Sequence, residues 1–249
     1  MSFVATILGS SGVFATVDRA SSGYLVDVDG HPLWMDAGAG TWRNLLGHLD
    51  YPELEGVILT HRHPDHTSDI WQAVHAFQWG QKEQLAPIPL WTTREAMAAL
   101  SAFSTDLGNV FDLRPVGPGD VVSFAGAEIS FFEMKHIPGT VGVRIEYAGK
   151  TLAYSADAGP SGNLPELAAN ADVFICEATY LKDEAGDWDG HLNAAQAARV
   201  AQDAGAKRLV LTHLHPKKDH GRSLNEAQAV APGLRVELAY DGLRMEVDA

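Results

Sequence analysis

Three histidines and one aspartate lie within six consecutive residues of this chain, directly after a short apolar segment. Residues 57–60 have the sequence of a buried, β-branched strand, and His61, His63, Asp65 and His66 follow it. A tight loop after such a strand directs alternate side chains into one cavity, and imidazole and carboxylate groups bind zinc and related divalent ions. We therefore predict a metal site here. A histidine-rich polar loop without ligand function is the plain alternative.

Three distant residues repeat the same arrangement of a strand followed by a ligand type. His136 follows residues 131–135, Asp157 follows residues 152–156, and His213 follows residues 209–212. Taken alone, each is more typical of a structural residue. Strand ends that meet along one edge of a sheet are a natural place to assemble a site. Together with the first cluster, they favour a shared ligand set.

The segment 61–66 resembles the HxHxDH motif of the metallo-β-lactamase superfamily, and the later residues match that family in order over essentially the whole chain. The resemblance implies an α/β fold, a four-layer αββα sandwich. It also implies two divalent metal ions, zinc first, with manganese or iron as alternatives. The implied ligands of the first ion are His61, His63, His136 and Asp157. Those of the second are Asp65, His66, Asp157 and His213, so that Asp157 bridges the ions.

The chain reads as a single domain over residues 1–249, because no Pro/Ser-rich linker divides it. Asp29-Gly30 predicts a hairpin turn. Asn193 is a candidate N-cap for a helix that ends before Gly205. The apolar runs predict strands at 3–8, 24–28, 33–35, 57–60, 121–124, 128–134, 141–147, 151–154, 173–176, 209–212, 235–239 and 243–247, and a strand-helix pair over 89–103. Further helices are predicted at 41–48, 70–77, 164–169 and 193–204.

Two later segments resemble ribonuclease Z, a branch of the same superfamily. Residues 173–180 resemble its HEAT segment, with Cys176 in place of the histidine. Residues 190–196 resemble a segment whose histidine helps to protonate the leaving group. The resemblance implies this catalytic role for His191, with Glu177 orienting it. The alternative is that His191 only bonds a nearby carboxylate, Asp187 or Asp189.

Two glycine-containing loops also resemble that branch. Residues 10–12 resemble its loop beside the substrate phosphate, so the backbone N–H groups of Ser11 and Gly12 are predicted to bind substrate. Residues 36–40 resemble a loop that supports the metal site. The implied mechanism is hydrolysis by a hydroxide that bridges the two metals, with Asp65 as a ligand that also steers the hydroxide.

The charge and one missing segment narrow the predicted substrate. The formal net charge of −14 disfavours long nucleic acids, which usually meet a basic protein surface. The arm that clamps tRNA in many ribonuclease Z enzymes would lie between Asp157 and His191, and the connection here is short. We therefore predict a phosphodiesterase for a small phosphodiester such as a cyclic nucleotide. The alternatives are a ribonuclease Z-type tRNA 3′-processing endonuclease, a lactonase or β-lactamase-like hydrolase, and a non-catalytic binding domain.

The cysteine content and the lack of targeting signals predict where the protein is located in the cell. The single cysteine, Cys176, lies in an apolar run and is expected in the core. The N-terminus has no signal-peptide pattern, and no apolar run is long enough to span a membrane. We expect a cytoplasmic protein.

A homodimer is possible, because dimers are common in the branch that the chain resembles. Of the pair His213 and His215, only the first is expected to face the metals.

Overall fold

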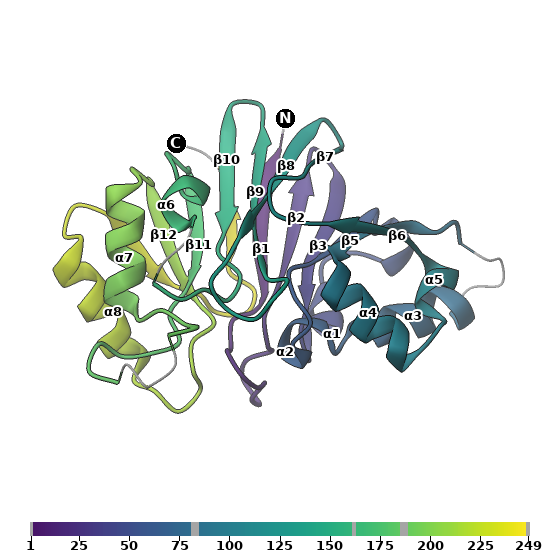
Figure 1. Cartoon of the computed structure of the whole chain (residues 1–249), viewed down its shortest axis with the longest axis horizontal. Coiled ribbons are helices and arrows are strands. Elements are labelled where there is room, and N and C mark those ends of the chain that lie inside the picture. The colour runs from purple at the N-terminus through teal and green to yellow at the C-terminus, as the bar shows by residue number, and fades with distance from the viewer. Residues whose placement is uncertain (1, 81–84, 161–162, 185–188, 248–249) are drawn as a thin grey trace.

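The computed structural model describes residues 2–80, 85–160, 163–184 and 189–247. Two mixed sheets of seven strands pack face to face in this part of the chain (Figure 1). The first sheet has the order β14-β1-β2-β3-β4-β5-β6. Its strands, in that order, are Arg244–Glu246, Phe3–Gly9, Gly23–Val28, His31–Ala37, Gly56–Leu59, Ile88–Thr93 and Phe111–Val116.

The second sheet has the order β13-β12-β11-β10-β9-β8-β7. Its strands are Arg235–Leu238, Arg208–Thr212, Val173–Glu177, Lys150–Tyr154, Val141–Tyr147, Ala127–Glu133 and Val121–Phe124. Strands β10 to β13 are parallel neighbours. Strands β11 and β12 are apolar and almost wholly buried, as expected for parallel strands with both faces covered.

Helices cover the outer face of each sheet (Figure 1). Those on the side of the first sheet are α1 (Thr41–Leu45), α2 (Pro64–Thr67), α3 (Ile70–Trp79), α4 (Arg94–Phe103) and α5 (Leu107–Val110), with a short 3₁₀ turn, η1, at Tyr51–Glu53. Those on the side of the second sheet are α6 (Leu164–Leu167), α7 (Ala194–Asp203) and α8 (His220–Val230).

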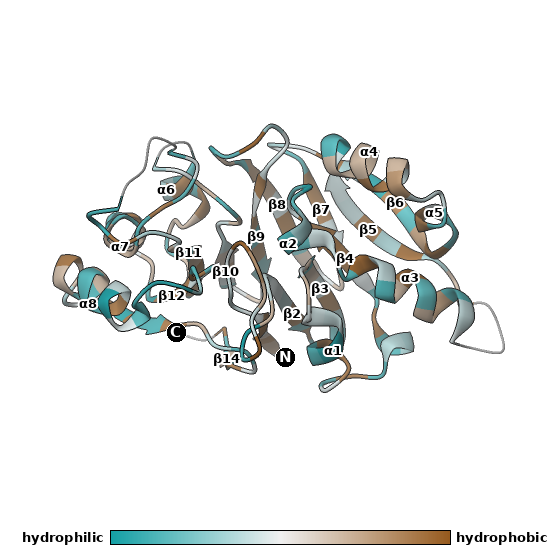
Figure 2. Cartoon of the chain, turned by 90° about the horizontal axis from the view of Figure 1, so that it is seen from below, coloured by the Kyte–Doolittle hydropathy of each residue, from teal (hydrophilic) through white to brown (hydrophobic). Residues whose placement is uncertain are grey.

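The buried apolar residues form three hydrophobic clusters in the described part of the chain. One cluster lies between the sheets and joins residues such as Ile7 and Met35 to Ile129 and Ile175. A second packs the other sheet against α6, α7 and α8, and a third packs the first sheet against α1, α3 and α5. Figure 2 shows the hydrophobic residues concentrated on the strands between the helical layers. The predicted four-layer αββα sandwich is therefore confirmed.

Local structure follows the sequence signals at most positions. Asp29 and Gly30 have φ angles of 55° and 90°, which suit the turn of the β2–β3 hairpin. The helix predicted at 41–48 is shorter, because it gives way to tight turns after Leu45 around Gly47. Strand β6 was not predicted. It is an edge strand with Pro115, a residue that weakens the strand signal.

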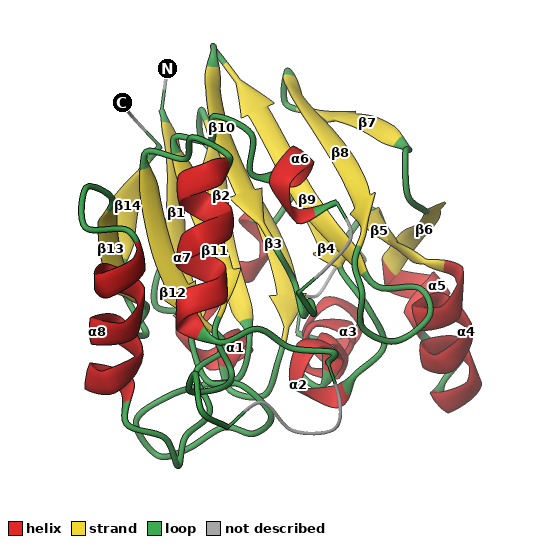
Figure 3. Ribbon diagram, turned by 60° about the vertical axis from the view of Figure 1, so that its left-hand side comes forward, coloured by secondary structure: helices red, strands yellow, loops and turns green. Residues whose placement is uncertain are grey.

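The ends of β4, β8, β10 and β12 lie on one side of the sandwich, together with α1 and α2 (Figure 3). The candidate ligands follow these four ends, as predicted. Val141 N–H also donates to the carbonyl of Thr60, which links the two sheets beside the first cluster. No helix in the described residues is long and apolar enough to cross a membrane.

Candidate metal centre

The first predicted ligand set comes together in the structure. His63 Nδ1 lies 3.2 Å from His61 Nε2 and 3.1 Å from His136 Nε2. Asp157 Oδ2 lies 3.7 Å from His61 Nε2 and 3.5 Å from His136 Nε2. Four ligands bound at ~2.1 Å to a tetrahedral metal are separated by roughly 3.4 Å from one another. The observed spacing fits such an ion, which would be bound by Nδ1 of His63 and by Nε2 of the other two histidines.

The second predicted set shares Asp157 with the first. Asp157 Oδ1 lies 3.2 Å from His66 Nε2 and 3.3 Å from His213 Nε2. Asp65 Oδ2 lies 3.3 Å from His213 Nε2 and 3.9 Å from His66 Nε2. The two carboxylate oxygens of Asp157 therefore face different sets. This is the arrangement that a carboxylate bridging two ions requires.

Two buried atoms test whether these residues fit a metal. His66 Nε2 and Asp157 Oδ1 are buried and have no hydrogen-bond partner. Buried polar groups are almost always satisfied, and each exception calls for an explanation. A cation between the two atoms would satisfy both. All the donors are histidine nitrogens and carboxylate oxygens, which suit zinc and related catalytic metals.

The electrostatics of the cluster also favour a bound cation. Burial lowers the pKa of His61, His63 and His136, so these imidazoles are neutral, the form that binds metals. Burial acts in the same direction on His66, but Asp157 and Asp36 outweigh it and raise the pKa of His66 well above its usual value. Carboxylates that attract a proton to this position attract a divalent ion for the same reason.

Asp36 fixes the orientation of His66. Its Oδ2 accepts a hydrogen bond of 2.7 Å from His66 Nδ1, which leaves Nε2 free to face the second set. The carboxylate also accepts bonds from Thr60 N (2.8 Å) and from the buried Tyr154 hydroxyl (2.9 Å). Asp36 also has a φ of 58°, a left-handed backbone conformation that is uncommon for residues other than glycine. The loop 36–40 was predicted to support the metal site, whereas the contribution of Tyr154 was missed.

His136 and His213 are also oriented through their second ring nitrogen. His136 Nδ1 donates to the carbonyl of Gly190 over 2.9 Å. His213 Nδ1 lies 2.8 Å from Thr179 Oγ1, and that hydroxyl donates to Glu177 Oε2 over 2.8 Å. The hydroxyl oxygen therefore accepts a hydrogen bond from the Nδ1–H of His213. Thr179 was also missed, because nothing in its local sequence indicates a contact with a residue 34 positions away.

The partly buried His191 and the buried Glu177 form a pair beside the second set. His191 Nδ1 donates to Glu177 Oε1 over 2.7 Å. The ring of His191 stacks on that of His213 with centroids 5.3 Å apart, and it lies 4.9 Å from that of His136. Burial opposes the charged form of His191, but the Glu177 carboxylate dominates and raises the pKa to about 9. Asp189 instead pairs with Lys135, and Asp187 lies outside the described residues.

The predicted substrate loop lies beside His213. A Cβ on Gly12 would lie 2.6 Å from His213 Nδ1, so only glycine fits there. However, Ser11 N donates to Ala20 O and Gly12 N to Leu214 O, so neither N–H group is available to a phosphate in this structure. The Val13 N–H faces the site instead and donates to Asp65 Oδ2 over 3.0 Å. Substrate binding by this loop stays a prediction.

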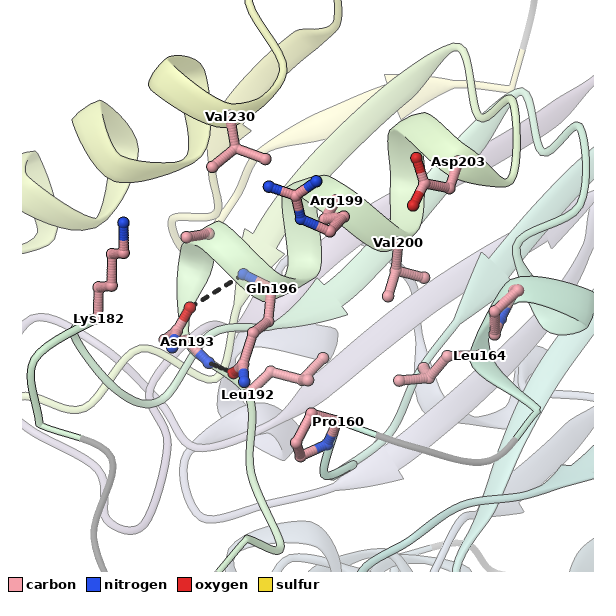
Figure 4. Close-up of a pocket in the computed structure, with 12 residues that line it drawn as sticks. Pro160, Leu164, Lys182, Leu192, Asn193, Gln196, Arg199, Val200, Asp203 and Val230 are labelled. Atoms are coloured by element: carbon pink, nitrogen blue, oxygen red, sulfur yellow. Dashed lines mark hydrogen bonds between the residues drawn. The ribbon is translucent and has the colours of Figure 1, made fainter.

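Two cavities flank the centre without containing it. One, of about 630 Å³, reaches the candidate ligand His136 and also has Arg94 and Lys135 in its wall. The other, of about 510 Å³, is mostly apolar and lies beside α7 (Figure 4). Figure 4 shows the reciprocal bonds between Asn193 and Gln196 that cap α7, two residues after His191. The predicted N-cap at Asn193 is thus confirmed.

The sequence is similar to known proteins over most of its length. The family model described as "Beta-lactamase superfamily domain" matches residues 22–214, which is more than half of the chain. The chain belongs to the β-lactamase superfamily. Within this superfamily, an uncharacterized protein of Mycobacterium tuberculosis, Rv1339, is 32% identical over 237 residues, covering 92% of this chain and 86% of that protein.

Two further relatives carry names that describe an activity. The probable metallo-hydrolase YhfI of Bacillus subtilis is 28% identical and covers 97% of this chain and 98% of its own. Its crystal structure superposes with a TM-score of 0.90 over 98% of both chains at 27% identity. Ribonuclease Z of Archaeoglobus fulgidus is 26% identical over 99% of this chain and 98% of its own. These similarities identify the chain as a metallo-hydrolase of the β-lactamase superfamily.

Proposed function

We propose that this protein is a phosphodiesterase that uses two divalent metal ions, zinc first, to hydrolyse a small phosphodiester such as a cyclic nucleotide. The observation that carries this proposal is the hydrogen-bonded pair of His191 and the buried Glu177, which lies beside two ligand sets that share Asp157. The pair supplies a protonated imidazole next to a hydrolytic centre. An alkoxide that leaves phosphorus needs such a proton donor.

The ligand residues would hold the two ions as the sets above describe, with Asp157 between them. When bound, the ions would supply Lewis acidity, which withdraws charge from a phosphoryl oxygen and lowers the pKa of water. The protein orients the ligands through Asp36, Gly190 and Thr179, so little rearrangement is needed when the ions bind.

His191 is proposed to act as the general acid. Glu177 accepts a hydrogen bond from the Nδ1–H of the charged ring, and the proton on Nε2 is the one proposed to go to the leaving group. Glu177 is held in place in turn by Ala158 N at 2.8 Å and by the Thr179 hydroxyl. This carboxylate is therefore a positioning group that also keeps His191 protonated. Asp65 is proposed to be a ligand whose carboxylate also faces the attacking water.

The runner-up is tRNA 3′ processing, which the relative named ribonuclease Z favours. Two observations argue against it. The alignment with that relative runs over 305 positions against 249 residues here, so the relative contains segments that this chain lacks. The net charge of −14 also disfavours binding to a long polyanion. A lactonase remains the third candidate, because the same centre is able to attack a carbonyl. A cytoplasmic location and a homodimer stay predictions.

The candidates are separated by assaying metal-loaded protein with three substrates: 3′,5′-cyclic AMP, a tRNA precursor with a 3′ trailer, and a simple acyl lactone. The proposal expects metal-dependent turnover of the cyclic nucleotide and at least 100-fold lower kcat/KM for the other two. Cleavage of the precursor at the 3′ end with higher kcat/KM would favour the runner-up. Turnover of the lactone alone would overturn the phosphodiester assignment.

A further inference from the structure

The loop between β1 and β2 places apolar side chains in solvent beside the metal centre. Val13 is 49% exposed, Phe14 41% and Val17 100%. Single exposed apolar residues are ordinary, but a group of them beside a cluster of candidate metal ligands points to a binding surface. The loop reaches the candidate ligands directly, because Val13 N–H donates to Asp65 and Gly12 touches His213.

The backbone of this loop is strained at Val13. Val13 has a φ of 68°, and Phe14 N–H donates to the carbonyl of Gly12 over 2.7 Å, which closes a γ-turn around Val13. A β-branched residue with positive φ is a rare and costly conformation, and such strain gathers at functional sites. The bond from Val13 to Asp65 holds the turn in place. Phe14 is therefore held at a fixed position beside the second ligand set.

Phe14 makes an edge-to-face ring contact with His215, close in sequence to the candidate ligand His213. The two rings lie 6.0 Å apart with an angle of 84° between their planes. His215 is only two residues after the candidate ligand His213, and its Nδ1 accepts a hydrogen bond of 3.2 Å from Lys217 N. Neutral His215 therefore carries its proton on Nε2, as a hydrogen-bond donor. The two rings thus form a corner, in which Phe14 supplies a flat apolar face and His215 supplies a ring with a polar edge.

We propose that Phe14 and His215 form a subsite for a flat aromatic group of the substrate, a nucleobase, while the phosphate lies at the metal centre. A base stacked on one ring meets the other ring edge-on, which is the favoured geometry for aromatic groups. Every base has a face that stacks, so the corner selects nucleotides over aliphatic phosphate esters without reading one base. This inference rests on the proposed function and names its substrate class.

The test compares two phosphate monoesters, one that carries a nucleoside and one that carries only a methyl group. Isothermal titration of the metal-loaded protein gives the Kd of adenosine 5′-monophosphate and that of methyl phosphate. The selectivity ratio is the Kd of methyl phosphate divided by the Kd of adenosine monophosphate. Adenosine monophosphate should bind more tightly to the wild type. Phe14→Ala should lower the ratio by roughly 5- to 150-fold, the range for loss of one base–aromatic contact. Phe14→Tyr should retain the ratio, because it keeps the ring.

The matched control is Val17→Ala, which removes an equally apolar and more exposed side chain from the same loop and should leave the ratio unchanged. His215→Ala should lower the ratio independently of any effect on the turn at Val13. An unchanged ratio in both Phe14→Ala and His215→Ala, or an equal drop in Val17→Ala, would overturn the subsite. Binding needs no cleavage, so a protein that fails to hydrolyse cyclic AMP but loses selectivity in Phe14→Ala would disprove the proposed function and support the subsite.

Discussion

Glu177 bonds His191 and, through one hydroxyl, also His213. Its Oε1 accepts a hydrogen bond from His191 Nδ1 over 2.7 Å. Its Oε2 accepts one from the Thr179 hydroxyl, whose oxygen in turn accepts a hydrogen bond from His213 Nδ1. One buried carboxylate thus orients the proposed acid and one proposed metal ligand. Loss of the proposed acid, His191, should therefore affect the rate, whereas loss of the proposed ligand, His213, should affect metal binding.

Replacing His191 by alanine should slow hydrolysis while both metals stay bound. Loss of a general acid lowers kcat by about 10²–10⁴-fold. Metal content per chain, measured by atomic emission after dialysis, should equal that of the wild type. Because Glu177, His191 and His213 also lie close enough together to hold an ion, loss of one metal in His191→Ala would show a ligand role instead.

Replacing Glu177 by glutamine should move the basic limb of the kcat–pH profile to lower pH. The acid must be protonated to act, so activity that depends on it is present below the pKa of His191 and is lost as the pH rises through it. The carboxylate raises that pKa to about 9 in the metal-free chain. Its removal lowers the pKa, whereas bound metals shift both proteins in the same direction. A basic limb at the same pH in both proteins would assign it to another group.

Replacing Asp36 by asparagine should lower the affinity of the protein for the second metal ion. The change removes the charge that fixes His66, and loss of such a supporting group costs about 10- to 100-fold in metal affinity. Competition with a chromophoric chelator measures the two affinities. Tyr154→Phe removes only one of the bonds to Asp36 and should have a smaller effect in the same direction. Equal affinities in wild type and Asp36→Asn would show that His66 is positioned without this carboxylate.

Replacing Gly12 by alanine should displace His213. The new Cβ would lie 2.6 Å from both the Nδ1 and the carbonyl oxygen of His213. A displacement of about 1 Å at such a centre costs on the order of 100-fold in kcat. Gly233→Ala is the matched control, because no atom lies within 4 Å of its Cβ position. Full activity in Gly12→Ala would mean that His213 tolerates the shift.

The ligand positions could be predicted from sequence because each follows the end of an apolar strand, where chain direction alone brings the side chains to one edge. The burial of Cys176 could also be predicted, since the three strand residues before it, 173–175, are apolar. The supporting contacts could not. Tyr154 and Asp36 are 118 positions apart, and their bond depends on how the two sheets face each other. The same holds for Val13 and Asp65, a contact that no local pattern indicates.

The central claim is tested most directly by hydrolysis of bis(p-nitrophenyl) phosphate with zinc- or manganese-loaded protein, chelator-stripped protein and Asp157→Ala. The account predicts turnover in the loaded wild type. It also predicts that turnover is lost on stripping, is restored by adding the metal back, and is nearly absent in Asp157→Ala, because that residue faces both ligand sets. Turnover that survives both stripping and Asp157→Ala, or no turnover by wild type with two metals bound, would contradict it.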